Sequence, residues 1–301
     1  MNAVTGAFGY TGKYIARRLL ELGDPVIALT GHPGRPNEFG GAVKAFSFRF
    51  DSPESMAESL AGVRVLYNTY WIRFDRGRAT HERAVANTRA LIRAAGIAGV
   101  RRLVHISIAN PDPESPLPYF RGKALLEAEI RKSGIGHAIL RPTVIFGRED
   151  ILVNNIAFLL RKAPVFAIPG TGQYRLQPVF AEDVARIAVE AAHASGDMVI
   201  DAVGPETFSF EELVRLIAKT VGSRAVLLHA PPRVALLAAR ILGVVLGDVV
   251  LTQDEQSGLM ASLLVSAAAP TGSTALSRWL ADNAATLGTR YASEIRRHYV
   301  S

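Results

Sequence analysis

The stretch Val4-Thr-Gly6-Ala-Phe-Gly9-Tyr-Thr-Gly12-Lys decides how the chain begins to fold. It follows a short apolar run, Met1–Thr5, and leads into an amphipathic segment, Gly12–Leu22, so we expect it to join a β-strand to an α-helix. Glycines spaced G-x-x-G-x-x-G allow a tight turn, close approach of the backbone to a bound group, and close helix–strand packing. A helix that begins at such a loop presents backbone amides to a pyrophosphate. The stretch therefore predicts dinucleotide binding, the alternative being a tight turn with a structural role alone. The expected contacts in the loop are Gly6, Phe8, Gly9, Tyr10, Thr11 and Gly12.

Outward from this loop, short apolar runs alternate with helical patterns. The predicted strands are Met1–Thr5, Val26–Leu29, Val43–Phe48, Val63–Tyr67, Arg102–Ile106 and His137–Leu140. The predicted helices between them are Gly12–Leu22, Pro53–Leu60, Thr80–Ala95 and Tyr119–Ser133. Near-continuous apolar strands alternating with helices indicate a parallel sheet that helices cover on both faces. The fold class predicted is therefore α/β, with a Rossmann-type doubly wound parallel sheet.

The regular alternation ends near residue 147, where a helix and a Pro/Gly-rich segment, Pro164 to Gln177, follow. A further strand, Met198–Ala202, is predicted to return to the sheet. We therefore expect residues 1–147 together with 179–203 to form an NAD(P)-binding Rossmann domain. Residues 148–178 together with 204–301 are expected to form a smaller, helix-rich C-terminal lid that contacts the substrate.

Composition excludes several classes of protein. The 301 residues are 49% hydrophobic and 20% charged, which is typical of a globular protein. The net charge of +7 comes mainly from arginine (28 Arg, 6 Lys), scattered along the chain without the basic stripe that a nucleic-acid groove requires. The absence of cysteine excludes disulfides and thiolate chemistry, and no histidine pair predicts a metal site. We expect no leader and no integral membrane span, and a cytoplasmic location.

The end of the second strand bears on which dinucleotide binds. A carboxylate there would bind the ribose 2′-hydroxyl of NAD and repel the 2′-phosphate of NADP. This chain has Thr30, His32 and Arg35 instead, which favours NADP(H), with NAD(H) as the alternative. Arg35 as a simple surface residue of a Gly/Pro loop is the competing interpretation. Asp51, after the third strand, is expected either to bind the adenine amino group or to belong to a helix cap.

Tyr119 and Lys123 are four residues apart, so both side chains lie on one face of the predicted helix between the fifth and sixth strands. An ammonium group near a phenol favours the phenolate and lowers the phenol pKa from about 10. Such a phenol exchanges a proton with a carbonyl oxygen while hydride reaches the carbon. The pair predicts an acid/base dyad; the alternative is a surface tyrosine packed beneath a lysine stem.

Together these motifs, with Leu140-Arg-Pro-Thr-Val-Ile-Phe-Gly147, resemble the short-chain dehydrogenase/reductase superfamily. More narrowly, the chain is similar to its extended and atypical branches, which include the NAD(P)H-binding epimerase-like proteins related to the nucleotide-binding accessory subunit of respiratory complex I. The similarity extends over about residues 1–220.

The resemblance implies roles for individual residues. It implies that Asn68, Thr69 and Tyr70 line the adenosine ribose. It implies that Pro142, Thr143 and Val144 lie against the nicotinamide carboxamide. It also implies Tyr119 as acid/base, Lys123 on the nicotinamide ribose, and Ser107 near the nicotinamide as the third catalytic residue. The position where the family places its catalytic hydroxyl aligns with Ser107 or with Ile108; the second alignment removes a donor worth roughly a few kcal/mol to the transition state.

Three functions follow as expectations. The first is an oxidoreductase that moves hydride between NADP(H) and a small carbonyl, hydroxyl or quinone-like substrate. The second is a non-catalytic NAD(P)H-binding sensor or assembly protein, and the third is a sugar-nucleotide epimerase. Trp71, Phe74, Phe146 and Phe166 are expected to form an apolar substrate pocket or ordinary core. The amphipathic segment Val234–Leu251 is expected to pack in the lid, with peripheral contact to a membrane or a partner as the alternative. The sequence predicts no oligomeric state.

Overall fold

The computed structural model describes residues 1–298, and the chain divides into two compact units. Unit 1 comprises Met1–Pro142 and Ala181–Ala202, and unit 2 comprises Thr143–Phe180 and the described residues from Val203 onward. The unit boundaries lie at residues 142/143, 180/181 and 202/203, whereas the sequence placed them at 147/148, 178/179 and 203/204. The largest difference arises because Val144–Phe146 form a strand that pairs with Pro178–Phe180 inside unit 2.

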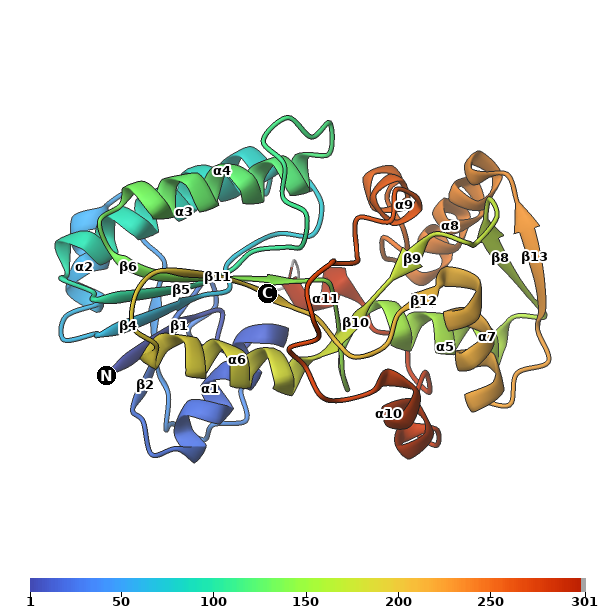
Figure 1. The fold of residues 1–301 in the computed structure, drawn as a ribbon, viewed down its shortest axis with the longest axis horizontal. Coiled ribbons are helices and arrows are strands. Elements are labelled where there is room, and N and C mark those ends of the chain that lie inside the picture. Colours follow the sequence, from blue (N-terminus) through green and yellow to red (C-terminus); the bar gives the residue numbers. More distant parts are fainter. Residues whose placement is uncertain (299–301) are drawn as a thin grey trace. The chain divides into compact units, whose positions relative to one another are not determined.

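Unit 1 is a seven-stranded parallel sheet (Figure 1). Its strands are β1 (Asn2–Thr5), β2 (Val26–Thr30), β3 (Lys44–Ser47), β4 (Val65–Asn68), β5 (Arg102–Ile106), β6 (Gly136–Pro142) and β11 (Met198–Ala202). The spatial order is β11-β6-β5-β4-β1-β2-β3, and every pair is parallel. The chain therefore leaves β1 in one direction and returns on its other side at β4, which makes the β1/β4 edge the switch point of the sheet. The predicted doubly wound fold is confirmed.

Helices cover both faces of this sheet. They are α1 (Tyr10–Glu21), α2 (Pro53–Ser59), α3 (His81–Ile97), α4 (Pro118–Lys132) and α6 (Ala181–His193). Figure 1 shows α2, α3 and α4 on one face, and α1 with α6 on the other. β1, β2 and β5 are buried at every residue, which is why these strands read as continuous apolar runs in the sequence. Local signals fix the helix starts: Ser52 and Thr80 accept from backbone amides three residues later.

Unit 2 contains small sheets as well as helices. Its strands are β7 (Val144–Phe146), β8 (Val165–Pro169), β9 (Arg175–Leu176), β10 (Pro178–Phe180), β12 (Phe208–Ser209) and β13 (Val226–Ala230). They form three two-stranded sheets, β10-β7, β12-β9 and β13-β8. The helices are α5 (Leu152–Lys162), α7 (Phe210–Thr220), α8 (Pro232–Leu246), α9 (Gln253–Met260), α10 (Leu276–Asn283) and α11 (Glu294–His298). Strands of two to five residues are too short to show an alternating pattern, so the sequence predicted helices and missed most of these ladders.

The core of unit 2 is a single cluster built on α5, α7 and α10, to which Phe146, Tyr174 and Leu280 belong. Phe166 packs against this cluster, and Phe146 contacts Phe180 and Trp279. These two phenylalanines thus serve ordinary core packing, the alternative that the sequence left open for them. Among residues 1–298, none of the helices combines the length and apolar content needed to cross a bilayer.

Candidate dinucleotide site

The glycine loop joins β1 to α1 as the sequence predicts. Gly6 has φ +61°, in the region that favours glycine, and its amide donates to Leu29 O at 2.8 Å. The Gly9 amide donates to Gly6 O at 2.8 Å and closes the turn. A Cβ on Gly12 would lie 2.3 Å from Gly6 O, so only glycine lets the helix approach the loop this closely. Gly6 and Gly12 therefore have the structural roles that the fingerprint requires.

The start of α1 fits a pyrophosphate. Its N-cap is Gly9, which has no side chain to accept from the first amides of the helix, and the first turn contains no acidic residue. Amides of the first turn, such as those of Thr11 and Gly12, have no acceptor within the helix. Phe8 flanks the loop with its ring 6.2 Å from that of Phe39, and the ring of Tyr10 packs against that of Tyr14. The loop thus offers donors and partial positive charge where the dinucleotide phosphates would bind.

The ends of β1 and β4 are tied together beside this loop. The Thr5 hydroxyl donates to Asn68 Oδ1 at 3.1 Å and accepts from the amides of Thr69 and Tyr70 at 2.8 and 2.9 Å. The Thr69 hydroxyl donates to Thr5 O, and the Tyr70 hydroxyl accepts from Asn87 Nδ2 at 2.7 Å. Asn68 is fully buried, so it supports this edge from below and is not open to a ligand. Thr69 and Tyr70 are half-buried.

Three aromatic rings gather at the neighbouring edge, next to the end of β3. Phe48 and Phe50 stack with centroids 4.6 Å apart, and the ring of Tyr70 lies 5.2 and 5.0 Å from them. All three are half-buried, so part of each ring is open to a flat ligand such as adenine. The sequence singled out Tyr70 alone. The missed signal is the Phe-x-Phe spacing, which places both rings on one side of an extended segment.

The polar residues predicted for the adenosine half have different positions. Thr30 ends β2 and is buried, and its hydroxyl accepts from the amide of His32 at 3.2 Å. His32 is exposed and Arg35 is half-buried. The Arg35 amide donates to His32 O at 3.1 Å and closes a turn. Asp51 is exposed directly before Ser52, the N-cap of α2. Strand β2, Val26–Thr30, ends without an acidic residue.

Tyr119 and Lys123 lie on the first turns of α4 within a ring cluster. The half-buried Tyr119 ring lies 5.7 Å from the Trp71 ring at 80° and 5.9 Å from His81. The His81 imidazole has an Asp75 carboxylate oxygen 2.6 Å from Nδ1. Gly122 makes room for Trp71, because a Cβ there would lie 2.7 Å from the indole ring. Trp71 and His81 thus surround the phenol from the segment after β4.

Lys123 is 2% exposed, and its ammonium has two neighbours. Nζ donates to Ile106 O at 2.6 Å and lies 4.6 Å from the centroid of the Trp71 ring. Burial lowers the pKa of Lys123 to about 7, and Glu127 opposes the shift. Asn68 Nδ2 donates to Nδ1 of the fully buried His105 at 3.0 Å. Burial and the nearby Lys123 lower the pKa of His105.

Ser107 follows β5 and is 3% exposed. Its hydroxyl donates to Glu127 Oε1 at 2.7 Å. Arg141 holds the same carboxylate in a two-pronged contact, Nε to Oε1 at 2.9 Å and Nη2 to Oε2 at 2.6 Å, and Arg131 adds a third contact at 3.2 Å. A serine hydroxyl has a single proton, so this one is committed to Glu127. The side chain of Ile108, the other residue that aligns with the catalytic hydroxyl, has no hydrogen-bond donor.

The remaining predicted residues fall on both sides of a unit boundary. Pro142 ends β6 in unit 1, and its carbonyl accepts from the amide of Ala109 at 2.8 Å. Thr143 and Val144 begin unit 2, where the Thr143 hydroxyl donates to Gln177 O and Val144 pairs with Pro178. Within unit 1, three parts of the candidate site follow the carboxyl ends of adjacent strands. The glycine loop follows β1, the Thr69–Tyr70 segment follows β4, and the dyad on α4 follows β5.

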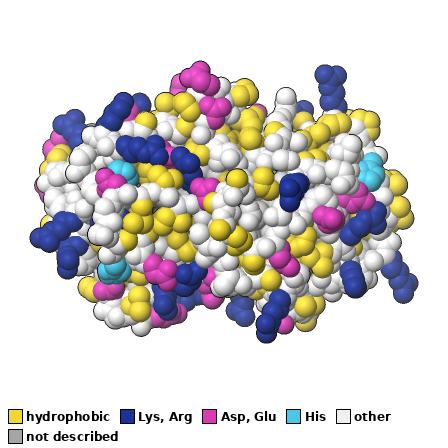
Figure 2. All heavy atoms as spheres, viewed as in Figure 1, with side chains coloured by type: hydrophobic (Ala, Val, Ile, Leu, Met, Phe, Trp, Pro, Cys, Tyr) yellow, Lys and Arg dark blue, Asp and Glu magenta, His cyan; other side chains and the backbone are white. Residues whose placement is uncertain are grey.

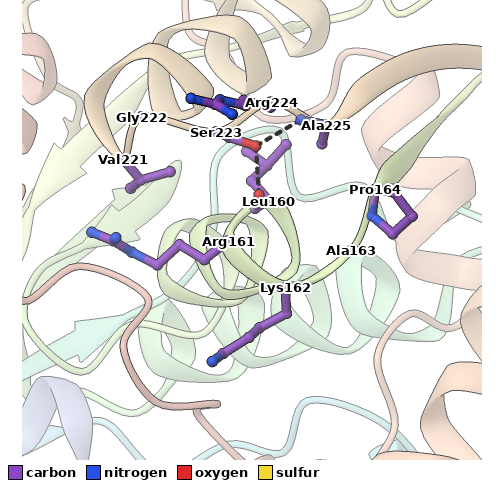
Figure 3. Close-up of a pocket in the computed structure, with 10 residues that line it drawn as sticks. All are labelled: Leu160, Arg161, Lys162, Ala163, Pro164, Val221, Gly222, Ser223, Arg224 and Ala225. Atoms are coloured by element: carbon purple, nitrogen blue, oxygen red, sulfur yellow. Dashed lines mark hydrogen bonds between the residues drawn. The ribbon is translucent and has the colours of Figure 1, made fainter.

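Unit 2 has a hollow of about 520 Å³ at the C-terminal ends of α5 and α7 (Figure 3). The Ser223 hydroxyl donates to Leu160 O and so links the segment after α7 to α5 at this hollow. The hollow is lined by the basic side chains Arg161, Lys162 and Arg224 as well as by the two helix C-termini, which carry partial negative charge. Residues 1–298 contain no cluster of three or more His, Asp or Glu side chains placed to hold a metal ion.

Known proteins match both the sequence and the fold. A family model described as NAD(P)H-binding matches residues 6–195. Subunit 9 of the NADH dehydrogenase (ubiquinone) 1 alpha subcomplex, mitochondrial, from Arabidopsis thaliana is 26% identical over 226 residues, which is 71% of this chain but 56% of that relative. The mitochondrial NADH-ubiquinone oxidoreductase 40 kDa subunit from Neurospora crassa is 24% identical over 84% of this chain and 68% of its own. The photosystem II assembly factor Ycf39 from Guillardia theta is 23% identical over 76% of this chain and 72% of its own.

Solved structures match at low identity and show the fold alone. A nucleoside-diphosphate-sugar epimerase from Staphylococcus aureus has a TM-score of 0.75 and 17% identity, covering 93% of this chain and 99% of its own. A triphenylmethane reductase from Citrobacter sp. has a TM-score of 0.75 and 20% identity, covering 94% and 98%. The Rossmann-like fold of this family is confirmed.

The expected cytoplasmic location is wrong by these matches. The relatives from Arabidopsis thaliana, Mus musculus and Neurospora crassa are all named as mitochondrial proteins. The prediction depended on composition and on the lack of cysteine, and neither feature distinguishes compartments among globular proteins without disulfides.

Proposed function

The chain belongs to the NAD(P)H-binding family, and on that premise we propose that it holds a nicotinamide dinucleotide as a resident group and acts as an accessory or assembly protein of a larger complex. The observation that carries this proposal is the Ser107–Glu127 contact. Carbonyl reduction by this type of site is accelerated by a second hydroxyl that, beside the Tyr119 phenol, donates to the developing oxyanion. Ser107 donates instead to a carboxylate fixed by Arg141, and its neighbour Ile108 has nothing to donate.

The names of the relatives support the same role. They are subunits of a respiratory NADH dehydrogenase and assembly factors of photosystem II, so the family includes members that work within large assemblies. This chain spans 56% of the length of the Arabidopsis thaliana relative, so its role is proposed for the dinucleotide-binding part they share. The partner class we propose is therefore protein, with NADP(H) favoured over NAD(H) at the Thr30–Arg35 segment.

The chemistry that NAD(P)H supplies when bound is hydride transfer. Residues that would hold it are the glycine loop at the pyrophosphate, Phe48 and Tyr70 at the adenine, and Tyr119 with Lys123 at the nicotinamide ribose. The Lys123 ammonium would have to exchange its contact with Ile106 O, or share it, to reach a ribose hydroxyl. In this proposal Tyr119 and Lys123 help to keep the dinucleotide bound and do not act as an acid/base pair.

A second function is favoured by one observation. Lys123 lies four residues from Tyr119 on one helix, and His81 with its Asp75 partner packs against the same phenol. These groups together support an oxidoreductase that uses Tyr119 as its acid, acting on a carbonyl or quinone without the serine. A sugar-nucleotide epimerase has no comparable observation in its favour.

Turnover distinguishes the two functions. The purified chain is loaded with NADPH or NADH, and oxidation is followed with carbonyl and quinone acceptors for the wild type and for Tyr119→Phe. We expect bound nucleotide and no difference in oxidation between the two proteins. A wild-type rate at least 100-fold above that of Tyr119→Phe, with unchanged affinity for NADPH, would overturn the accessory role and establish the oxidoreductase.

A further inference from the structure

Helix α8 in unit 2 has an apolar face open to solvent. Its exposed aliphatic side chains recur every three or four residues, which places them on one side of the helix. They are Val234 (54% exposed), Leu237 (57%), Ile241 (60%), Val244 (84%) and Val245 (75%). We call these five residues the α8 stripe. Figure 2 shows hydrophobic side chains (yellow) open to solvent where Figure 1 draws α8.

The opposite side of α8 provides its attachment to unit 2. Ala235, Leu236 and Gly243 are buried there, and the helix packs against β8 and α9. The helix is therefore apolar on both sides, which a helix with one side in water is not expected to be. Single exposed aliphatic residues need no explanation, but five in one row indicate a surface that is covered when the protein works.

Charge indicates what covers it. Arg233 and Arg240 are both exposed and seven residues apart, so they lie on the same flank of the stripe. The helix Pro232–Leu246 contains no acidic residue, and no salt bridge described for residues 1–298 involves either arginine. An aliphatic face flanked by arginines is complementary to the acyl chains and anionic headgroups at the surface of a bilayer.

Two other occupants fit less well. In a symmetric pair of copies, a two-fold axis at the middle of the stripe would place the Arg240 side chains of both copies close together. The centre of a protein interface usually has aromatic or hydrogen-bonding anchors, and the stripe has neither. Val, Leu and Ile alone provide area without directional contacts, which is what insertion among lipid chains requires.

We propose that the α8 stripe docks unit 2 on the surface of an anionic membrane, with Arg233 and Arg240 at the headgroups. The helix lies in the plane of the interface and does not span the bilayer, since its 15 residues are too few. This docking does not depend on the glycine loop or on the Tyr119–Lys123 dyad, which lie in unit 1.

Co-sedimentation of the full chain with vesicles tests the proposal. Vesicles of phosphatidylcholine with phosphatidylglycerol are compared with vesicles of phosphatidylcholine alone. We expect binding to the anionic vesicles that falls with added salt. The triple variant Leu237→Ser, Ile241→Ser and Val244→Ser should lower the partition coefficient at least tenfold. Replacing both arginines by glutamine should lower it several-fold on anionic vesicles only.

Unit 1 offers a matched control. Leu22 and Ile97 are 53% and 54% exposed, so replacing both with serine removes exposed aliphatic surface away from α8 and should leave vesicle binding unchanged. Circular dichroism and NADPH affinity confirm that each variant is folded.

Three results would overturn the proposal. They are no binding to anionic vesicles, equal loss of binding in the control variant, and a stable dimer in solution that the triple variant dissociates. The last result would assign the stripe to a second copy of the chain.

Discussion

Gly12→Ala is the substitution for which the structure predicts the clearest effect. An ideal Cβ at this position would lie 2.3 Å from Gly6 O, 2.7 Å from Gly6 C and 3.0 Å from Thr5 O. All three atoms are backbone atoms, so no side chain can rotate away. Helix α1 must move from the loop, or the loop must change its turn. Either change displaces the amides that face the pyrophosphate.

The magnitude follows from two opposing contributions. Overpacking in a well-packed region costs about 1–3 kcal/mol, and a contact with backbone belongs at the upper end. Replacing glycine with alanine inside a helix gains roughly 0.5–1 kcal/mol in the absence of a clash. We therefore expect Gly12→Ala to lower the free energy of unfolding by about 2 kcal/mol, a fall of about 4–8 °C in Tm. We expect the Kd for NADPH to rise at least tenfold, since about 1.4 kcal/mol of lost contact gives that factor.

Gly96 is the matched control. It lies inside α3, and a Cβ there would meet nothing within 4 Å. Gly96→Ala should raise the free energy of unfolding by roughly 0.5–1 kcal/mol and leave NADPH affinity unchanged. Urea unfolding followed by circular dichroism measures stability, and nicotinamide fluorescence measures affinity. If Gly12→Ala matched Gly96→Ala in both measurements, the close approach of α1 to the loop would be refuted.

Three further substitutions test the site. Glu127→Gln should lower the free energy of unfolding in urea by about 2–3 kcal/mol, because the buried carboxylate that holds Arg141 is lost. The half-buried Glu129, which pairs with Arg89, is the control, and Glu129→Gln should change that free energy by less than about 0.5 kcal/mol. Equal effects would contradict the buried network. Burial lowers the pKa of Lys123 from 10.5 to about 7 in the folded chain. Between these two pH values the unfolded state binds more protons than the folded state, so the free energy of unfolding should rise with pH there. Lys123→Met should lose this rise, and an identical pH dependence in both proteins would refute the lowered pKa. Arg35→Ala should weaken NADPH binding about tenfold and leave NADH binding unchanged in fluorescence titration; an equal effect on both would remove Arg35 from the 2′-phosphate site.

The sheet and its glycine loop could be predicted because their signals are local. Buried parallel strands such as β1 and β5 appear as continuous apolar runs, and the loop combines three glycines with a strand before and a helix after. The spacing of Tyr119 and Lys123 likewise requires only that the segment be helical, which it is. Each of these predictions depends on residues close together in the chain.

What the sequence missed depends on contacts between distant residues. Ser107, Glu127 and Arg141 meet across β5, α4 and β6, and no spacing rule indicates that the serine proton is used there. Trp71 reaches Lys123 only because Gly122 leaves room for the indole ring. The ladders of unit 2 were missed for a different reason, since strands of two to five residues are too short for an alternating pattern to be detected.

Energy transfer from Trp71 to reduced nicotinamide tests the central claim most directly. The chain has two tryptophans, so Trp279→Phe leaves Trp71, at the dyad, as the single donor. With NADPH added, we predict quenched indole emission and sensitised nicotinamide emission that stays constant when a quinone acceptor is present. The signal should be lost or strongly weakened when Gly12→Ala is added. Sensitised nicotinamide emission that is unchanged by Gly12→Ala would contradict the proposed binding site. Sensitised emission that decays when the quinone is added to the protein with Tyr119, but not to Tyr119→Phe, would contradict the resident, non-catalytic role.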